Sequence, residues 1–235
     1  MNTTFKKLSS ISFFCPAYND EKNLPVLIPY VSRFLSEITD TFEIIIVHDG
    51  GADKTGEVAD ALTLEFPHVR VIHHPKNLGY GATLRDGFLV SKYDYVIYTD
   101  GDNQYDVREF LPYLHLLETA DVMSGHAREK AVSFRRKVQS FVYNALIFLL
   151  FFVRFHDVDC AMKIYKRKVI DAITIKSTSC FIDAEMIIKS KKAGFLVSQF
   201  PVTHFPRTEG VASGSKMSVI FPTVKEMFQY RFGVL

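Results

Sequence analysis

The sequence predicts an α/β fold in which a Rossmann-like, mostly parallel sheet is flanked by helices. Three observations lead to this fold class. Short runs of β-branched and aromatic residues alternate with segments of helical periodicity. Each of these runs ends in residues that are typical of turns. The 235 residues, 48% of them hydrophobic, are enough to bury the core of one domain.

Strands and helices are expected to alternate through the first half of the chain. The strands are expected at residues 11–15, 43–47, 69–73 and 95–99. The helices are expected at residues 24–38, 55–66, 82–91 and 107–118. The first helix has apolar residues every three to four positions, whereas Pro112 weakens or kinks the last one. Such alternation implies parallel strands that are joined by right-handed crossovers.

Composition and charge exclude several classes of protein. The chain is too apolar to be disordered. Its net charge of +2 gives no signal for nucleic-acid binding, so no nucleic-acid partner is expected. Cys15, Cys160 and Cys180 match no zinc motif and argue against a disulfide scaffold, which favours a reducing, cytosolic location. The apolar run 11–17 is too short for a secretory signal.

Residues 141–153 form the most apolar stretch of the chain. It fits a buried core helix or a helix that lies in a membrane interface, because the basic residues 135–137 before it suit anionic headgroups. A membrane span needs about 20 apolar residues and would be marginal here. We expect an apolar helix over residues 138–155, within a main domain of residues 1–217 that is followed by an amphipathic tail at 218–235.

Polar side chains follow each expected strand, where parallel sheets bind ligands. The tips of three of the four strands carry carboxylates, whose mutual repulsion calls for a cation or for hydrogen-bond donors. Asp100 and Asp102, separated by Gly101, can engage both a hard divalent cation and a ribose. Mg²⁺ or Mn²⁺ in such a site takes substrate phosphate oxygens as further ligands. Alone, this pair also fits an ordinary turn.

Several motifs occur together in one order: FFCPAYNDEKNL, IIIVHDGGADKT, NLGYGATLRDGF, YVIYTDGDNQYD, SGHARE, RRKVQSFVYN, DVDCAMKIYKR, FIDAEMIIKSKKAGF and FPVTHFPRTEGVASGSK. With these motifs, residues 10–216 resemble the inverting family 2 glycosyltransferases of the GT-A fold. Within that family the chain is similar to the polyprenyl-phosphate sugar transferases, such as dolichol-phosphate mannose synthase. The motifs are specific for the fold and the donor class, less so for the acceptor, and nearly silent on the sugar.

The resemblance implies a nucleotide-sugar site with a metal ion. Nucleotide-sugar binding would involve Pro16, Ala17, Tyr18, Glu21, Asp49, Asp53, Gly79, Gly81, Arg85, Asp100, Gly101, Arg207 and Lys216. Mg²⁺ or Mn²⁺ would be held by Asp100, Asp102 and Gln104. In this reading Asp49 bonds the base and Asp53 supports its loop, although His48 stands where the family often has an acid. Arg207 and Lys216 would belong to a mobile loop that closes over the diphosphate, unless that loop is a plain surface loop.

The acceptor phosphate would be bound by Arg128, Arg136 and Ser140 in this resemblance. Arg136 and Ser140 are four residues apart and share one helix face. A guanidinium and a hydroxyl together suit a phosphate. The alternative is that the basic cluster forms a solvated face.

The catalytic carboxylates implied by the resemblance are Asp102, Asp159, Asp183 and Glu185. Asp159 would face the reaction centre, or else form an ion pair with Lys163 or Arg167. Asp183 and Glu185 match the general-base motif of relatives with hydroxyl acceptors, and the alternative for both is a structural role. A phosphate acceptor needs no base because it is already ionised, whereas a hydroxyl acceptor does. The histidines His73, His74 and His204 are interpreted as structural or exposed.

The expected function is metal-dependent, inverting transfer of a sugar from a UDP- or GDP-sugar to a polyprenyl phosphate. The alternatives are transfer to a hydroxyl of a glycan or small molecule, and a non-catalytic nucleotide-sugar sensor. A nucleotidyltransferase or a Rossmann dehydrogenase is disfavoured because their glycine-rich motifs are missing after the first strand. We expect peripheral attachment to the cytosolic face of a membrane, with an integral membrane protein as a further partner.

Overall fold

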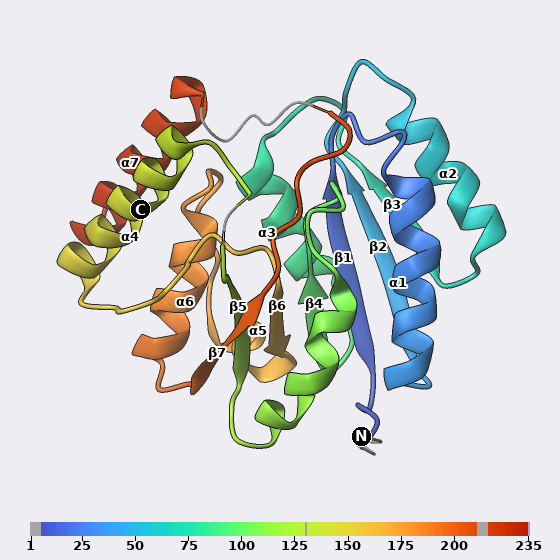
Figure 1. The fold of residues 1–235 in the computed structure, drawn as a ribbon, viewed down its shortest axis with the longest axis horizontal. Coiled ribbons are helices and arrows are strands. Elements are labelled where there is room, and N and C mark those ends of the chain that lie inside the picture. The colour runs from blue at the N-terminus through green and yellow to red at the C-terminus, as the bar shows by residue number, and fades with distance from the viewer. Residues whose placement is uncertain (1–5, 130, 211–215, 235) are drawn as a thin grey trace.

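A computed structural model describes residues 6–129, 131–210 and 216–234 of the chain. Its centre is a seven-stranded sheet with the order β3-β2-β1-β4-β6-β5-β7 (Figure 1). The strands are β1 (Ile11–Ala17), β2 (Phe42–His48), β3 (Val69–His73), β4 (Tyr95–Tyr98), β5 (Val122–Ala127), β6 (Lys163–Lys166) and β7 (Val197–Val202). The α/β fold that the sequence predicts is confirmed.

The first four strands form the parallel half of the sheet. β1 lies between β2 and β4, and β2 also pairs with β3, all in parallel. The register places Phe14 between Ile45 and Tyr98. All four strands were expected from the sequence, and their ends differ from the expectation by no more than two residues. Parallel strands buried on both faces are nearly continuous apolar runs, which makes them easy to recognise.

The other half of the sheet was not expected from the sequence. β6 runs antiparallel between β4 and β5, and β5 pairs in parallel with β7. β5 contains Ser124, Gly125 and His126, so it lacks a continuous apolar run. β7 contains Pro201, which a sheet tolerates because β7 is an edge strand. The strand pattern is therefore weak where the sheet changes direction.

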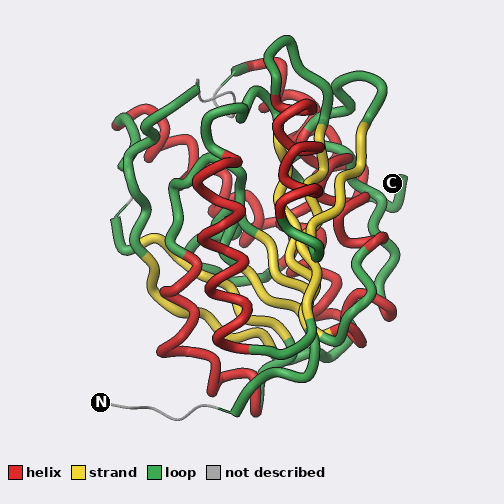
Figure 2. The backbone as a smooth tube through the Cα atoms, turned by 90° about the vertical axis from the view of Figure 1, so that its right-hand side faces the viewer, coloured by secondary structure: helices red, strands yellow, loops and turns green. Residues whose placement is uncertain are grey.

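Helices cover both faces of the sheet (Figure 2). One face packs against α1 (Leu24–Ile38), α2 (Thr55–Glu65) and η1 (Val107–Glu118). The other packs against α3 (Tyr80–Val90), α4 (Phe134–Phe151), α5 (Arg167–Ala172), α6 (Ile182–Lys192) and α7 (Met217–Arg231). The sheet thus separates a first core, on the side of α1, from a second core, on the side of α3. In β1, Phe13 points to the first core and Phe14 to the second, as the two-residue period of a strand requires.

The segment over Val107–Glu118 has the bounds that were expected, but it is a 3₁₀ helix. Pro112 lies inside it and has no N–H to donate to an α-helical hydrogen bond. Asp106 caps its start by accepting a hydrogen bond from the Arg108 N–H at 2.8 Å. The expected kink at proline is thus replaced by a tighter helix along the whole segment.

The apolar helix α4 is not a core helix, so that interpretation is wrong. Of its 18 residues only Ile147 and Phe151 are buried. We call the exposed apolar side chains of α4, α7 and the residues that follow them the α4–α7 apolar surface. It consists of Phe134, Val138, Phe141, Val142, Phe148, Leu149, Phe152, Met217, Phe221, Phe228, Phe232 and Val234. None of the helices in the described part of the chain combines the length and apolar character that a bilayer crossing requires.

The C-terminal segment forms a helix that is anchored on the domain. α7 lies beside α4 in Figure 1. It buries Thr223 and Met227, and the ring of Tyr230 lies 5.6 Å from that of Phe151 and 5.7 Å from that of Phe181. Its other side is exposed and includes the apolar side chains of Met217, Phe221 and Phe228.

Gly87 provides a test of the second core. A Cβ at this position would lie 2.3 Å from Cδ2 of the buried Phe14 ring, which Phe88 and Tyr98 hold on two sides. Overpacking of this kind costs about 1–3 kcal/mol, against a gain in helix propensity of at most about 1 kcal/mol. We therefore expect Gly87→Ala to lower the free energy of unfolding in urea by about 1–2 kcal/mol. The exposed Leu89 on the same helix provides the control, and Leu89→Ala should stay within about 0.5 kcal/mol of wild type. Equal stability of the two variants would contradict this packing.

Candidate active site

The loops after β1, β2 and β4 meet at one edge of the sheet. Ala17 pairs with His48 at the ends of β1 and β2, and the Asp49 N–H donates to the Ala17 carbonyl at 3.0 Å. β4 pairs with β1 on its other side, so Asp100 emerges next to the same loops. Parallel strands bring their carboxyl ends together in this way. The strand-end residues that the sequence singles out therefore share one site.

The carboxyl group of Asp100 is buried close to other acidic side chains. Its Oδ1 is buried and has no hydrogen-bond partner among the described residues. Burial, together with the nearby charges of Asp102 and Asp183, raises the pKa of Asp100 to about 8. A buried, unpaired oxygen beside other carboxylates is a position that a cation would stabilise.

Asp102 already has a cationic partner. Its buried carboxylate forms an ion pair with the Arg207 guanidinium. The Gln104 N–H donates to Asp102 Oδ1 at 3.1 Å. Between the two acids, Gly101 is required by space, because a Cβ there would lie 2.6 Å from the Pro16 carbonyl oxygen. The small residue lets the two carboxylates follow β4 directly against the end of β1.

These residues fit a hard divalent cation. Asp100 and Asp102 offer carboxylate oxygens, and the backbone N–H of Gln104 contacts Asp102, while the Gln104 side chain donates to the Phe205 carbonyl. No cluster of three or more His, Cys, Asp or Glu side chains suited to a metal ion occurs in the part of the chain that the structure describes. Mg²⁺ keeps several waters and takes substrate phosphate oxygens, so two carboxylates are a usual protein share. The metal ligand set stays a prediction that this chemistry supports.

The segment after β7 covers the acidic pair. Gln104 Nε2 donates to the Phe205 carbonyl at 2.9 Å, and the Phe205 N–H donates back to the Gln104 carbonyl at 2.9 Å. At its far end Glu209 pairs with Lys22 at 3.2 Å. These contacts bring Arg207 over the DGD motif, while the expected loop partner Lys216 is exposed and residues 211–215 lie outside the described residues.

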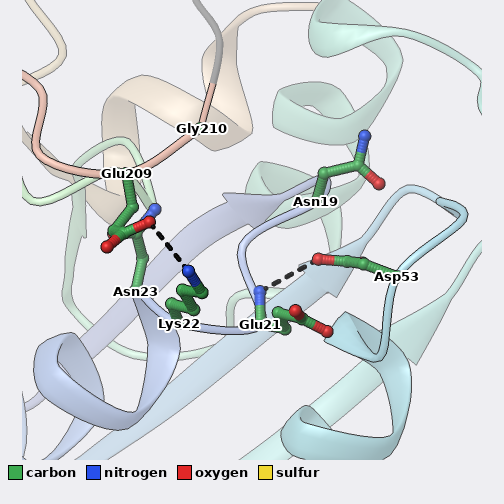
Figure 3. Close-up of a pocket in the computed structure, with 7 residues that line it drawn as sticks. All are labelled: Asn19, Glu21, Lys22, Asn23, Asp53, Glu209 and Gly210. Carbon is green, nitrogen blue, oxygen red and sulfur yellow. Dashed lines mark hydrogen bonds and ion pairs between the residues drawn. The ribbon is translucent and has the colours of Figure 1, made fainter.

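A small cavity lies where this segment crosses the β1 and β2 loops (Figure 3). Its volume is about 190 Å³, and its lining residues are Asn19, Glu21, Lys22, Asn23, Asp53, Glu209 and Gly210. The Glu21 N–H donates to Asp53 at 3.2 Å, and Glu21 Oε2 accepts from the Lys54 N–H at 2.9 Å. Asp53 also accepts from Thr55 Oγ1 at 2.7 Å, which is the loop support that the sequence suggested for it. Tyr18 is half exposed at the same edge.

Asp49 has a different environment from the one expected. Both of its oxygens are used inside the protein, where they accept from the N–H groups of Leu78 and Gly79 at 2.8 and 2.9 Å. His74 Nδ1 lies 2.7 Å from Asp49 Oδ1, and its Nε2 lies 3.1 Å from Asp86. Asp49 is buried by these contacts. These contacts let Asp49 order the loop before α3, and its bond to the base of a nucleotide stays a prediction.

Three of the expected donor residues lie at the start of α3: Gly79 precedes the helix, and Gly81 and Arg85 are in its first turns. Gly79 has φ +94°, a conformation that glycine adopts readily. Gly81 faces protein on its Cβ side, since a Cβ would lie 2.2 Å from the Ser179 carbonyl oxygen. The Arg85 Nε donates to the neighbouring Asp86 at 3.3 Å. Gly79 therefore provides the backbone conformation that starts the helix, and Gly81 allows the backbone at Ser179 to come close.

His48 and His73 pair beside this edge, with their Nδ1 atoms 3.0 Å apart. Burial lowers the pKa of His48, and the neighbouring His73 lowers it further. The ring also packs on the start of α2, where a Cβ on Gly56 would lie 2.9 Å from it. A histidine in place of the family's acid is therefore accommodated by a glycine and a second histidine.

A second, larger cavity lies where β5 ends and α4 begins. Its volume is about 390 Å³, and it is lined by Ala127, Arg128, Glu129, Lys137 and Ser140. The backbone N–H of Arg128 donates to the Val202 carbonyl at 3.0 Å, which fixes its place at the strand end. Arg128 and Ser140 are thus brought together as expected. Arg136 does not line the cavity, and Lys137 does; the sequence analysis missed Lys137, although it is three residues from Ser140 and so shares its face of the helix.

The family can now be stated from sequence comparison. The profile of the family described as "Glycosyl transferase family 2" matches residues 12–174, which is more than half of the chain. The chain belongs to this family. The resemblance seen in the motifs is thereby confirmed.

The chain is similar in sequence to two curated relatives that carry different sugars in their names. It is 30% identical to the undecaprenyl-phosphate 4-deoxy-4-formamido-L-arabinose transferase of Proteus mirabilis over 73% of the chain and 53% of that protein. It is 28% identical to the dolichyl-phosphate β-glucosyltransferase ALG5A of Trichomonas vaginalis over 89% of the chain and 68% of that protein. The chain spans between 33% and 68% of the length of the first three relatives that it matches.

The fold is that of GT-A glycosyltransferases. A crystal structure of glucosyl-3-phosphoglycerate synthase from Mycobacterium tuberculosis with phosphoglyceric acid superposes with a TM-score of 0.73. The match covers 97% of this chain and 81% of that one at 18% identity, which establishes the fold alone. The same synthase has also been solved with Mn²⁺, UDP and phosphoglyceric acid.

Asp183 belongs to a buried ion pair, and its charge is close enough to Asp100 to raise the pKa of that residue. The fully buried Lys163 donates from Nζ to Asp183 Oδ1 at 2.5 Å and to the Cys160 carbonyl at 2.7 Å. The Tyr98 hydroxyl donates to the same carboxylate. These contacts favour the structural alternative for Asp183.

The contacts of Glu185 favour the structural alternative as well. It is fully buried and accepts from the N–H groups of Lys176 and Ser177, and from Lys189 Nζ. A base must reach the proton that it abstracts, and this carboxylate faces donors of its own loop and helix. The acidic side chains of the FIDAEM motif therefore hold the fold around the site.

Asp159 is exposed at the end of the segment after α4. The two residues considered as ion-pair partners for it both have another carboxylate nearby: Lys163 binds Asp183, and Arg167 lies 3.9 Å from Asp171. The charge of Asp159 reaches Tyr143 and Cys180, both of which have a raised pKa owing mainly to burial. Its role at the reaction centre stays a prediction.

The buried pair of Lys163 and Asp183 makes a direct test possible. Lys163→Met leaves the Asp183 carboxylate buried without a cation, and breaking a buried pair in this way costs about 3–5 kcal/mol. We expect urea unfolding to show a loss of that size. The control is Lys168→Met, because Lys168 is exposed and pairs with Asp121 at 2.7 Å; it should lose no more than about 1 kcal/mol. Similar losses in both variants would contradict the importance of the buried pair.

Proposed function

We propose that this glycosyltransferase moves a sugar from a UDP- or GDP-sugar to a polyprenyl phosphate, such as dolichyl or undecaprenyl phosphate, with the help of Mg²⁺ or Mn²⁺. One observation carries the proposal. The cavity with Arg128, Lys137 and Ser140 opens at the start of α4, and the rest of this helix carries large exposed apolar side chains. An anionic group and a hydrocarbon chain on one molecule would match these two neighbouring surfaces.

The donor would bind at the edge formed by the β1, β2 and β4 loops. Asp100, Asp102 and Gln104 are the residues that would hold the divalent ion. When bound, such an ion neutralises the charge that develops on a leaving nucleoside diphosphate. Arg207 forms an ion pair with Asp102, and its guanidinium would help to neutralise the negative charge of the diphosphate. Pro16, Ala17, Tyr18, Arg85 and Lys216 remain proposed donor contacts.

The acceptor would be held by Arg128 and Lys137, with Ser140 as a hydrogen-bond donor. A phosphate monoester is ionised near neutral pH and attacks as an oxyanion, so no protein base is required. This agrees with the engagement of Asp183 and Glu185 in buried contacts. Attack on the anomeric carbon opposite the leaving diphosphate inverts its configuration, and fixing both reactants lowers the barrier through orientation.

The relatives support the acceptor class. Both are named for transfer to a polyprenyl phosphate, one undecaprenyl and one dolichyl, although their sugars differ. The synthase of the same fold was crystallised with Mn²⁺ and UDP, which supports a divalent metal in the family. A panel of UDP- and GDP-sugars would identify the sugar that this chain transfers.

We also propose peripheral attachment to the cytosolic face of a membrane. The α4–α7 apolar surface would enter the headgroup region, and Arg135, Arg136 and Lys137 would face anionic lipids. A polyprenyl phosphate resides in such a membrane, so this placement brings the enzyme to its acceptor. An integral membrane partner would hold the protein there after washing with high salt, and a wholly soluble distribution would argue against one.

The reaction is tested by release of nucleoside diphosphate from UDP- and GDP-sugars, with Mn²⁺ or Mg²⁺, in the presence and absence of a polyprenyl phosphate. We expect lipid-dependent release from one donor. Asp102→Ala should lower turnover by about 100-fold or more, because it removes charge stabilisation of the leaving group, while the fold is kept. The exposed Asp171 provides the control, and Asp171→Ala should leave turnover unchanged.

Two results would contradict this proposal. Wild-type activity of Asp102→Ala would remove the metal role of that residue. Release that ignores the lipid and responds to a soluble sugar would establish a hydroxyl acceptor and return Asp183 to consideration as the base.

Membrane attachment is tested with the exposed apolar residues of α4. Replacing both Phe141 and Leu149 by Ser removes two large side chains from the α4–α7 apolar surface. Burial of such side chains is worth about 1.5 kcal/mol or more each, so binding to phosphatidylserine-containing vesicles should fall by about tenfold or more. The control is Leu64→Ser, since Leu64 is 90% exposed on α2. Flotation of both variants with the vesicles to the same extent would contradict this docking face.

A further inference from the structure

Glu226 on α7 binds two consecutive residues of a distant segment. Its Oε1 accepts from the Thr178 N–H at 3.1 Å and from Thr178 Oγ1 at 2.9 Å. Its Oε2 accepts from the Ser179 N–H at 3.0 Å and from Ser179 Oγ at 2.6 Å. One carboxylate therefore satisfies four donors in a segment 47 to 48 residues earlier in the chain. Hydrogen bonds to an ionised acceptor are stronger than neutral ones.

The segment that Glu226 holds lies against the loop before α3. A Cβ on Gly81 would lie 2.2 Å from the Ser179 carbonyl oxygen and 2.4 Å from the Thr178 carbonyl carbon. Only the absence of a side chain at Gly81 allows this approach. The first turn of α3 and residues 178–179 are therefore in direct backbone contact, and neither can shift toward the other.

The same segment also faces the acidic edge of the sheet. Cys180 follows Ser179; burial raises the pKa of its thiol, and the charges of Asp159, Asp183 and Asp100 lie close enough to raise it in the same direction. The ring of Phe181 packs on Tyr230 of α7 at 5.7 Å. Residues 178–181 thus form a wall with α7 on one side, and the start of α3 and the carboxylates on the other.

We propose that Glu226 is a positioning residue for the nucleotide-sugar: by fixing residues 178–179 against Gly81, it sets the place of the loop that enters α3. The proposal rests on the proposed function, because that function places the nucleotide beside Gly79, Gly81 and Arg85. It gives α7 a second role besides its exposed apolar side. The C-terminal helix connects the surface proposed to face the membrane with the donor site.

The test uses Glu226→Ala and, as a milder variant, Ser179→Ala, which removes one of the hydroxyl donors. Lys225→Ala is the matched control, because Lys225 is the exposed neighbour on the same helix. Affinity for UDP and for GDP, each with Mn²⁺, is measured by calorimetry. Amide hydrogen exchange is followed at residues 79–84, and the thermal midpoint is recorded for each variant.

We expect Glu226→Ala to weaken binding of the preferred nucleotide by about fivefold, as is common for residues that act through another segment. Exchange at residues 79–84 should become faster, because the contact that holds the first turn of α3 is released. Ser179→Ala should change both in the same direction by a smaller factor, and Lys225→Ala should match wild type.

Unchanged nucleotide affinity together with unchanged exchange at residues 79–84 in Glu226→Ala would overturn the proposal. So would faster exchange confined to α7, because Glu226 would then anchor only its own helix. If the wild-type protein binds neither nucleotide, the proposed function fails instead. In that case exchange at residues 79–84 still decides whether Glu226 positions the loop.

Discussion

Asp100, Asp102 and Asp183 bring three carboxyl groups to one edge of the sheet, where their mutual repulsion has to be offset. The structure offsets it in three different ways. Asp183 has a permanent cation, because Lys163 is fully buried against it. Asp102 has the Arg207 guanidinium, which comes from the segment after β7 and is partly exposed. Asp100 has no cation and instead has a strongly raised pKa. A hard divalent ion suits this edge because neither Asp100 nor Asp102 is paired with a fully buried cation, as Asp183 is.

Close approach of backbone segments places these groups. Gly101 lets the DGD motif lie against the Pro16 carbonyl, and Gly81 lets α3 begin against Ser179. The antiparallel strand β6 supplies Lys163 from the middle of the sheet and separates the parallel donor half from β5 and β7. The cavity with Arg128 then opens on the far side of β6, at the end of β5. The proposed donor and acceptor regions would therefore lie on two halves of one sheet, which would fix the distance between them.

Where sequence reasoning and structure differ, the difference concerns which way a side chain faces. Asp49 was expected to bond a base, and in the structure its oxygens accept from the N–H groups of Leu78 and Gly79 and lie against the His74 ring. Arg136 was expected at the acceptor phosphate, and its neighbour Lys137 lines that cavity. The spacing of residues in a motif does not state which of two adjacent side chains points inward. That direction depends on where the helix begins and what it packs against.

The sequence by itself determined the α/β class, the four parallel strands, the helices between them and the meeting of acidic residues at one sheet edge. These follow from periodicity and turn chemistry within ten to fifteen residues, which local sequence encodes. The tertiary structure decided the partners of the carboxylates, the antiparallel strand β6 and the exposure of α4. Those depend on contacts between distant residues, such as Arg207 with Asp102, 105 positions apart, and Lys163 with Asp183, 20 apart. A buried charge is stable only where such a partner arrives, and only folding brings it there.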